Sequence, residues 1–210
     1  AAAFDPDRYS SLRGYADDVL EICEELDLRD VVFVGHSVAS MMGVLAAAER
    51  PERFARLVLV GPSPRYIDAD GYVGGFSRDD IDELLESLES NYLGWSRAMA
   101  PVIMGNADRP ELGDELTNSF CRTDPEIAAH FARVTFLSEH RADLARLAAP
   151  ALILQSSEDL IAPLSVGDYM ARTLPRPTLR IIEHVGHCPH LSAPGATAAA
   201  IDEFLAGLGH

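Results

Sequence analysis

The 210-residue sequence is poor in positive charge, and this scarcity argues against two classes of partner. It has 17 Lys and Arg against 33 Asp and Glu, a formal net charge of −16 at pH 7 and a pI near 4.7. No basic run occurs anywhere in the chain. Because such a surface repels phosphate backbones and anionic headgroups, neither a nucleic acid nor a membrane surface is expected as a partner.

Cysteine and long hydrophobic runs are also scarce. The three cysteines, Cys23, Cys121 and Cys188, are widely spaced and odd in number, which is not the pattern of a disulfide framework. No apolar run is long enough to span a bilayer, and no signal-peptide pattern opens the chain. A reducing cytoplasm is therefore the expected location. The chain begins AAAFDPDRYS, without methionine, which is typical of a processed or excised piece.

The apolar residues that are present, 48% of the total, suffice for one sizeable core. Short continuous apolar runs predict buried parallel strands, and apolar spacings of three and four predict helices. The predicted strands are residues 31–34, 56–61, 151–155 and 179–183, and the predicted core helices are residues 12–26, 41–50 and 197–208. Strand, helix and strand follow one another as in a βαβ unit, so the expected fold class is α/β with a mostly parallel sheet.

Residues 62–147 have a different character. Four amphipathic helical patterns follow one another there, with no strand pattern between them: RDDIDELLESLES, NYLGWSRAMAPVIM, PELGDELTNSF and PEIAAHFARVTFL. This predicts a helical lid inserted between two strands of the sheet. The expected organisation is a first core part at residues 1–63, the lid at residues 64–147 and a second core part at residues 148–210.

Unusual polar residues follow three of the four predicted strands. Ser37 lies in VVFVGHSVAS after the first strand, Asp159 in SSEDLIAP after the third, and His187 in HVGHCPH after the fourth. Functional groups of a parallel sheet gather at the carboxyl ends of its strands, so these side chains are expected to meet there. Nucleophile, acid and base in that chain order is the order of the α/β-hydrolase triad.

The chemistry of such a triad needs these residue types. A serine hydroxyl is a weak nucleophile until a neutral imidazole accepts its proton, and the imidazole needs a carboxylate on its other nitrogen. Gly35 and Ala39 keep both sides of the Ser37 turn small, although G-x-S-x-A departs slightly from the usual G-x-S-x-G. The backbone N–H of Val38, at a helix N-terminus, is expected to bind the oxyanion.

Each of these residues also has a less specific interpretation. Ser37 alone is compatible with a helix cap, and His187 with a hydrogen-bonded loop histidine. Glu158 and Asp159 alone are compatible with a solvated turn; of the two, the shorter Asp159 better suits a rigid loop. The segment HVGHCPH also contains a cluster of side chains that can bind a metal: His184, His187, Cys188 and His190. Zinc sites usually join two separated ligand pairs, and no second pair is evident elsewhere in the sequence, so no metal or cofactor is expected.

Longer blocks of the sequence resemble a known family. These blocks are VFVGHSVAS, VGPSPRYI, GGF, NYLGW, LILQSSEDLIAP and GHCPHLSAP, and they cover nearly the whole chain. They are similar to segments of the RsbQ-type hydrolases of bacterial energy-stress signalling, whose plant relatives are the karrikin and strigolactone receptors. The resemblance implies an α/β-hydrolase fold with a V-shaped, four-helix lid.

The same resemblance implies roles for individual residues. Ser37, Asp159 and His187 match the family's triad positions. Under the lid, the resemblance assigns three aromatic residues to an apolar pocket, with ordinary lid core as the alternative for each. These three are Phe76, Trp95 and Phe136.

The function implied by the resemblance is slow hydrolysis of a small hydrophobic ester or lactone, in a stress or small-molecule signalling context. In the bacterial branch the hydrolase acts with a PAS-domain phosphatase, which is the implied protein partner. Two other functions stay open. One is a ligand sensor that binds a partner protein with hydrolysis incidental, and the other is a cofactor-free haloperoxidase or perhydrolase, which uses the same triad.

The chain departs from this family at its beginning. The family's fold starts with four further strands and a loop that supplies a second oxyanion donor. The chain is therefore expected to be the carboxyl-terminal part of a longer protein, without that protein's N-terminal strands. The strand at residues 31–34, interior in character, would then have one unpaired edge. Losing one oxyanion donor typically costs about 10²–10³ in rate, so a poor catalyst is expected.

Overall fold

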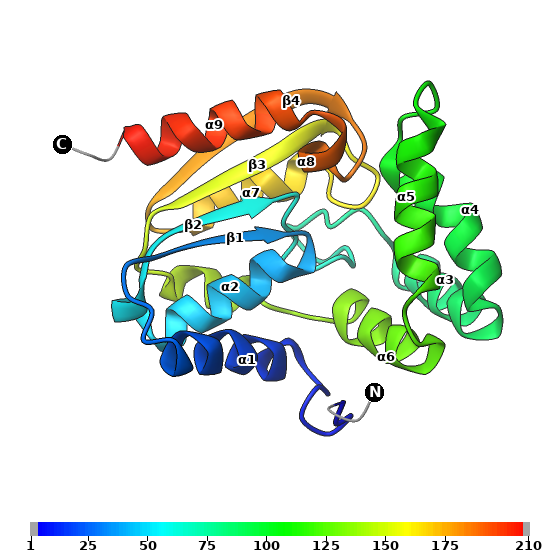
Figure 1. The fold of residues 1–210 in the computed structure, drawn as a ribbon, viewed down its shortest axis with the longest axis horizontal. Helices are drawn as coiled ribbons and strands as arrows, with labels where there is room; N and C mark the ends of the chain where they lie inside the picture. The colour runs from blue at the N-terminus through cyan, green and yellow to red at the C-terminus, as the bar shows by residue number, and fades with distance from the viewer. Residues whose placement is uncertain (1–3, 208–210) are drawn as a thin grey trace.

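A computed structural model describes residues 4–207 and shows an α/β architecture built on one parallel sheet (Figure 1). The described residues contribute four strands, hydrogen-bonded in sequence order. Each neighbouring pair is parallel, so all four carboxyl ends lie at the same edge of the sheet. The strands are β1 (Val31–His36), β2 (Phe54–Val60), β3 (Ala151–Glu158) and β4 (Pro177–Val185). The predicted fold class is therefore confirmed.

Helices cover both faces of this sheet (Figure 1). On one face, three helices contribute to a large apolar cluster: α1 (Leu12–Glu25), α2 (Val38–Glu49) and α7 (Leu164–Thr173). On the other face, α9 (Pro194–Ala206) contributes to a second cluster with β2, β3 and β4. The arrangement is a helix–sheet–helix sandwich, in which the sheet supplies the side chains for two separate cores.

Strand β2 shows why the central strands are continuously apolar. Leu57 and Leu59 belong to the first cluster, whereas Val58 and Val60 belong to the second. None of the four side chains is more than 2% exposed. Because successive residues of a strand point to opposite faces, a strand covered on both faces must be apolar at every position.

Strand β1 is expected to be interior in character but to have one unpaired edge in this chain. Among the described residues β1 pairs with β2 alone and lies at the sheet edge, so the expected unpaired edge is confirmed. Phe33 packs on the α1–α2 side, whereas Val32 and Val34 face away from it and are 41% and 55% exposed. On this face, the described contacts of α9 are mainly with β3 and β4, which leaves these two side chains of β1 largely uncovered.

The four predicted lid helices are present and lie together beside the carboxyl edge of the sheet (Figure 1). They are α3 (Arg78–Ser90), α4 (Tyr92–Met104), α5 (Pro110–Cys121) and α6 (Pro125–Phe136). Capping explains two of the starts: Ser77 and Asp80 form a reciprocal capping box before α3, and Asp124 accepts amides of the first turn of α6. The division of the chain at residues 63 and 147 stays a prediction.

The remaining elements are short or differ slightly from their predicted bounds. Single 3₁₀ segments occur at Pro51–Arg53 and Arg141–Arg146, and α8 (Pro189–Ser192) is one turn long. Helix α9 begins before the predicted residue 197 because Pro194 suits a first helical turn, and the predicted end at residue 208 lies outside the described residues. Between residues 4 and 207, no helix is both long and apolar enough to cross a membrane.

The two-sided burial of β2 makes a direct prediction about stability. Val58→Ala, at a fully buried position, is expected to lower the free energy of unfolding by about 2 kcal/mol through lost apolar burial and a residual cavity. Val34→Ala is the matched control, because Val34 pairs with Val58 in register and is half-exposed, so its expected change is within roughly 0.5 kcal/mol. Urea unfolding of this chain measures both. Equal losses would contradict the assignment of β1 to an exposed edge.

Candidate active site

Ser37 occupies a strained turn between β1 and α2. It is the single residue between the end of β1 at His36 and the start of α2 at Val38. Its φ of 55° and ψ of −128° are costly for a residue with a side chain, and such outliers cluster at functional sites. The Ser37 amide donates to the carbonyl of Val60 in β2 at 2.8 Å, which anchors the turn to the sheet.

Gly35 makes this turn sterically possible. A Cβ at Gly35 would lie 2.8 Å from the backbone of Ala39 and from the ring of Phe33. The atoms of Ala39 that approach Gly35 most closely belong to its backbone, which alanine and glycine share. The departure from the usual G-x-S-x-G pattern at Ala39 therefore leaves this contact unchanged.

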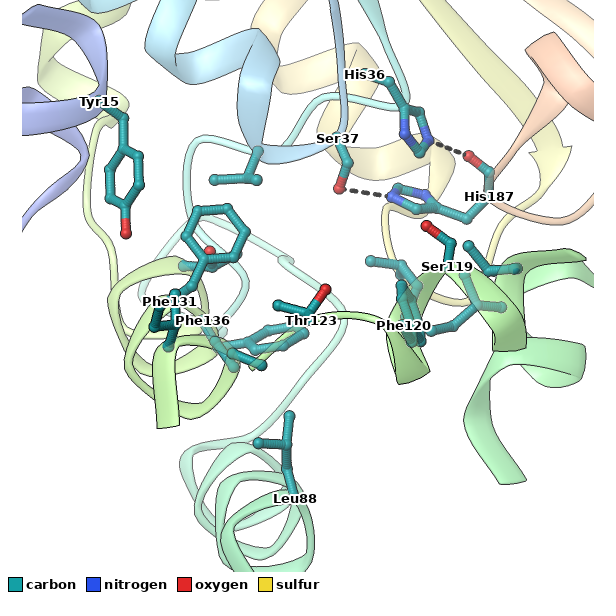
Figure 2. Close-up of a pocket in the computed structure, with 18 of the residues that line it drawn as sticks. Tyr15, His36, Ser37, Leu88, Ser119, Phe120, Thr123, Phe131, Phe136 and His187 are labelled. Atoms are coloured by element: carbon teal, nitrogen blue, oxygen red, sulfur yellow. Dashed lines mark hydrogen bonds between the residues drawn. The ribbon is translucent and has the colours of Figure 1, made fainter. Parts of the chain in front are cut away.

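The ring of His187 lies between Ser37 and Asp159. The Ser37 hydroxyl points at the ring and donates to Nε2 at an O···N distance of 2.8 Å (Figure 2). On the other side, Nδ1–H donates to Oδ2 of Asp159 at 2.7 Å. A carboxylate only accepts hydrogen bonds, so Nδ1 carries the proton and Nε2 of the neutral ring is free to accept. The structure thus brings the three residues predicted from strand ends within hydrogen-bonding distance.

Asp159 is held in place by its own loop. Its Oδ1 accepts from the amides of Ile161 at 2.8 Å and Ala162 at 3.1 Å, which leaves Oδ2 for His187. The side chain is only 1% exposed. Glu158, the other carboxylate considered, is the last residue of β3 and is exposed. Its backbone carbonyl accepts a hydrogen bond from the Gly186 amide at 2.7 Å. Between the two carboxylates, geometry selects Asp159.

Val38 lies where an oxyanion donor is expected. It is the first residue of α2, and the first four amides of a helix have no partner within the helix. These amides form the positive end of the helix dipole, directly beside the Ser37 hydroxyl. An oxyanion that forms on a substrate bound to Ser37 would therefore be stabilised at this place.

A cavity of about 840 Å³ opens beside Ser37 and His187, between the sheet edge and the lid. Its wall is mainly apolar, and the labelled side chains of Figure 2 show Phe131 and Phe136 of the lid on the side away from the triad. Trp95 of α4 also lines it and stacks on Phe120 at a centroid distance of 6.0 Å. Two of the three predicted pocket aromatics, Trp95 and Phe136, therefore border the cavity.

Phe76 is not part of the cavity wall. It packs into the lid cluster that contains Tyr66 and Ile81, and its amide donates to the Tyr66 carbonyl at 3.2 Å. This bond joins the backbone that follows the glycine-rich segment to the backbone at Tyr66. The structure thus corrects the expected role of Phe76 to lid core, the alternative considered for all three aromatics.

The cluster in HVGHCPH is engaged in contacts other than metal coordination. His184 Nε2–H donates to the Ser192 hydroxyl at 2.5 Å, and the ring of His190 lies 4.4 Å from that of His36. Burial raises the pKa of the Cys188 thiol to about 12, which disfavours the thiolate that a metal requires. In the part of the chain that the structure describes, no three His, Cys, Asp or Glu side chains are placed to hold a metal ion.

The loop that carries His187 is tied to the lid, a feature that the sequence reasoning missed. The His187 amide donates to the carbonyl of Ile103 near the end of α4 at 2.9 Å. Asn106 Nδ2 bridges the carbonyls of Met104 in the lid, at 2.5 Å, and Val185 in β4, at 3.1 Å. Asparagine after a helix is usually a capping residue, so no sequence signal distinguished Asn106.

Gly61 is a second missed position. It follows β2 with a φ of 55°, and a Cβ there would lie 3.1 Å from Cε1 and 3.2 Å from Nδ1 of His187, and 3.6 Å from Oδ2 of Asp159. The missing side chain leaves room for the Asp159–His187 hydrogen bond. The available signal was the position of this glycine directly at the carboxyl end of a buried strand, in VLVGPSP.

Comparison with known proteins identifies the family. A family model described as "Alpha/beta hydrolase family" matches residues 2–200 of the chain. The chain therefore belongs to the α/β hydrolase family, in agreement with its parallel sheet, its lid and the turn at Ser37.

Particular relatives are similar over most of the chain. The karrikin insensitive 2 receptor IA of Petunia hybrida is 39% identical over 195 residues, which cover 92% of this chain and 71% of that protein. A strigolactone esterase of Arabidopsis thaliana is 35% identical over 196 residues, with 93% and 73% covered. A solved structure of a hydrolase from Oleispira antarctica is 42% identical, has a TM-score of 0.94 and covers 97% of this chain and 75% of its own.

The close approach at Gly61 predicts a functional effect of one methyl group. Gly61→Ala is expected to displace His187 from Asp159 and lower kcat for ester hydrolysis by about 10- to 100-fold. Gly71→Ala is the control, because Gly71 has the same kind of φ, 70°, and nothing within 4 Å of its added Cβ. Steady-state kinetics with 4-nitrophenyl butyrate and urea unfolding compare the two. Equal kinetics in both variants would show that the contact at Gly61 does not matter.

The buried His36 ring predicts a pH-dependent component of stability. Burial, together with the neighbouring His187, lowers the pKa of His36 to about 3, whereas an unfolded histidine has a pKa near 6.5. Between these values the unfolded chain binds one more proton, so the free energy of unfolding falls with decreasing pH by up to about 1.4 kcal/mol per pH unit. In His36→Gln this component should disappear from the pH dependence of urea unfolding. Parallel curves for the two proteins would refute the prediction.

Proposed function

We propose that this protein is a serine hydrolase that cleaves a small hydrophobic ester or lactone through an acyl-enzyme intermediate. The observation that carries the proposal is the continuous hydrogen-bond chain from Ser37 Oγ through the His187 ring to the Asp159 carboxylate, at 2.8 and 2.7 Å. This chain begins at a hydroxyl held in a strained turn on the wall of an apolar cavity.

The proposed acylation step follows from this geometry. Ser37 Oγ attacks the substrate carbonyl carbon while its proton passes to Nε2 of His187. The imidazolium that forms is stabilised by the buried carboxylate of Asp159, which already accepts a hydrogen bond from Nδ1–H. The carbonyl oxygen becomes an oxyanion near the Val38 amide at the start of α2.

The remaining steps reuse the same groups. Collapse of the tetrahedral intermediate breaks the bond to the leaving alkoxide, which takes the proton from His187 Nε2, and an ester of Ser37 remains. A water molecule then attacks this ester, with His187 as the base, and releases the acid and Ser37. For a lactone, both products are parts of one hydroxy acid.

The cavity favours a hydrophobic substrate. Its volume of about 840 Å³ is within the range of small-molecule sites, and its lid side is lined by aromatic and aliphatic residues such as Trp95, Phe131 and Phe136. The names of similar proteins support the same reaction class, since one of them is called a strigolactone esterase.

A ligand-sensing role is the second candidate. It is favoured by the 39% identity with a protein named as a karrikin insensitive 2 receptor. In that role the bound ligand would alter the lid surface for a partner protein, and hydrolysis would be incidental. A signalling context, assignment to the RsbQ branch, a PAS-domain phosphatase partner and a cytoplasmic location stay predictions. The haloperoxidase or perhydrolase alternative rests on the shared triad alone.

Labelling with a fluorophosphonate tests the role of Ser37. The probe is expected to add one phosphonyl group to the wild-type chain and to Ser90→Ala, a control on an exposed helix end, but none to Ser37→Ala. Intact-mass analysis reads out the adduct, and 4-nitrophenyl esters of increasing acyl length report turnover. Labelling or turnover that survives in Ser37→Ala would overturn the proposed mechanism.

Two neighbouring carboxylates test the role of Asp159. Asp159→Asn is expected to lower kcat by roughly 10⁴-fold, because the amide favours the wrong histidine tautomer, as in the serine-protease precedent. Glu158→Gln removes the adjacent, exposed carboxylate and is expected to leave kcat unchanged. If Glu158→Gln has the larger effect on kcat, the assignment of the acid is wrong.

A further inference from the structure

We propose that His36, the residue before the nucleophile, is a positioning residue that holds the backbone of His187 in register with Ser37. This inference rests on the proposed role of His187 as the catalytic base. No step of the proposed reaction uses the His36 side chain, although its ring lies inside the site (Figure 2). Its function must therefore be exerted through another residue.

The contact that carries the inference is a hydrogen bond to the peptide of His187. Nε2 of His36 lies 2.7 Å from the His187 carbonyl oxygen, as drawn in Figure 2. A carbonyl oxygen only accepts, so Nε2 carries the proton and donates it. The bond joins the last residue of β1, next to Ser37, to the residue whose side chain accepts the Ser37 proton.

The His187 peptide is thus held from two sides. Its N–H donates to Ile103 of the lid at 2.9 Å, and its C=O accepts from His36 of the sheet at 2.7 Å. The preceding Gly186 adopts a φ of 108°, which favours a residue without a side chain, and its N–H donates to the Glu158 carbonyl at 2.7 Å. Of the two bonds, only the one from His36 connects His187, the proposed base, to β1, the strand that precedes the nucleophile Ser37.

The surroundings of His36 suit a fixed, uncharged donor. Its ring packs between those of His187, at 4.9 Å, and His190, at 4.4 Å. The ionisable groups that act on it are these two histidines and Asp159, and burial is the main cause of its lowered pKa. A neutral His36 adds no positive charge beside the imidazolium that forms during acylation, and the two neighbouring rings, tilted by 49° and 54° to it, restrict its rotation.

Removal of this donor should affect the rate and not the binding of substrate. A misplacement of about 1 Å at a catalytic group costs roughly 10²-fold in rate. His36→Phe keeps an aromatic ring between His187 and His190 but has no donor, so kcat for 4-nitrophenyl butyrate is expected to fall about 100-fold with KM nearly unchanged. His36→Gln places an amide N–H near the position of Nε2 and is expected to recover most of the lost kcat.

His130→Phe is a matched control. His130 Nε2–H also donates to a backbone carbonyl, that of Tyr9 at 2.9 Å, which borders the cavity but makes no hydrogen bond to a triad residue. Removing it deletes the same type of bond without removing a contact to the triad. We expect His130→Phe to keep the wild-type kcat. Thermal unfolding of every variant ensures that rates are compared below the unfolding transition, and His36→Met replaces His36→Phe if the latter does not fold.

A spectroscopic signal separates positioning from general stability. In wild-type protein, the His187 Nδ1 proton in its short bond to Asp159 should give a low-field proton NMR resonance. This resonance is expected to persist in His36→Gln and in His130→Phe and to shift or broaden in His36→Phe. A role limited to stability would leave it unchanged in all folded variants.

The possible outcomes distinguish this inference from the proposed function. Turnover that survives in Ser37→Ala refutes the proposed function, whatever the His36 variants show. Ser37-dependent turnover in which His36→Phe matches His130→Phe, or in which His36→Gln is as slow as His36→Phe, refutes the positioning role alone. A large loss of kcat that His36→Gln reverses supports it.

Discussion

The hydrogen bond between Ser37 and His187 depends on the parallel sheet more than on either residue. It joins positions 150 residues apart, and the intervening chain includes the whole lid. Parallel pairing of β1 through β4 places the ends of all four strands at one edge, so the turn after β1 and the loops after β3 and β4 converge there. The sheet topology thus brings these segments together, and hydrogen bonds between their side chains then form the site.

The lid is part of this convergence and not only a cover. The amide of His187 is bonded to Ile103, and Asn106 bridges the end of α4 to Val185 of β4. A displacement of the end of α4 therefore acts on the backbone of the residue whose side chain meets Ser37.

Much of this protein was predictable from local patterns. The parallel strands, the four lid helices and the three residues that follow strands β1, β3 and β4 were expected from apolar runs, helical spacing and chain order, because each signal is contained within a few neighbouring residues. The unpaired edge of β1 was expected, but the exposure of its outward face could not be predicted from the apolar run, since burial depends on which elements cover a strand: α9 packs mainly on β3 and β4 and leaves Val34 half-exposed. Phe76 packs in the lid cluster and does not line the cavity, a difference from Trp95 and Phe136 that depends on tertiary packing and not on local sequence.

By itself, the sequence determined which residue types stand at the ends of which strands, and thus the chemistry that the sheet edge can hold. Only the tertiary structure decided the contacts among them: Asp159 rather than Glu158 on the imidazole, the space left by Gly61, and the His36 bond to the peptide of His187. The physical reason is the separation along the chain of the residues that interact. Secondary structure follows from interactions between near neighbours, whereas a hydrogen bond near 2.7 Å between segments more than a hundred residues apart follows from how the elements pack.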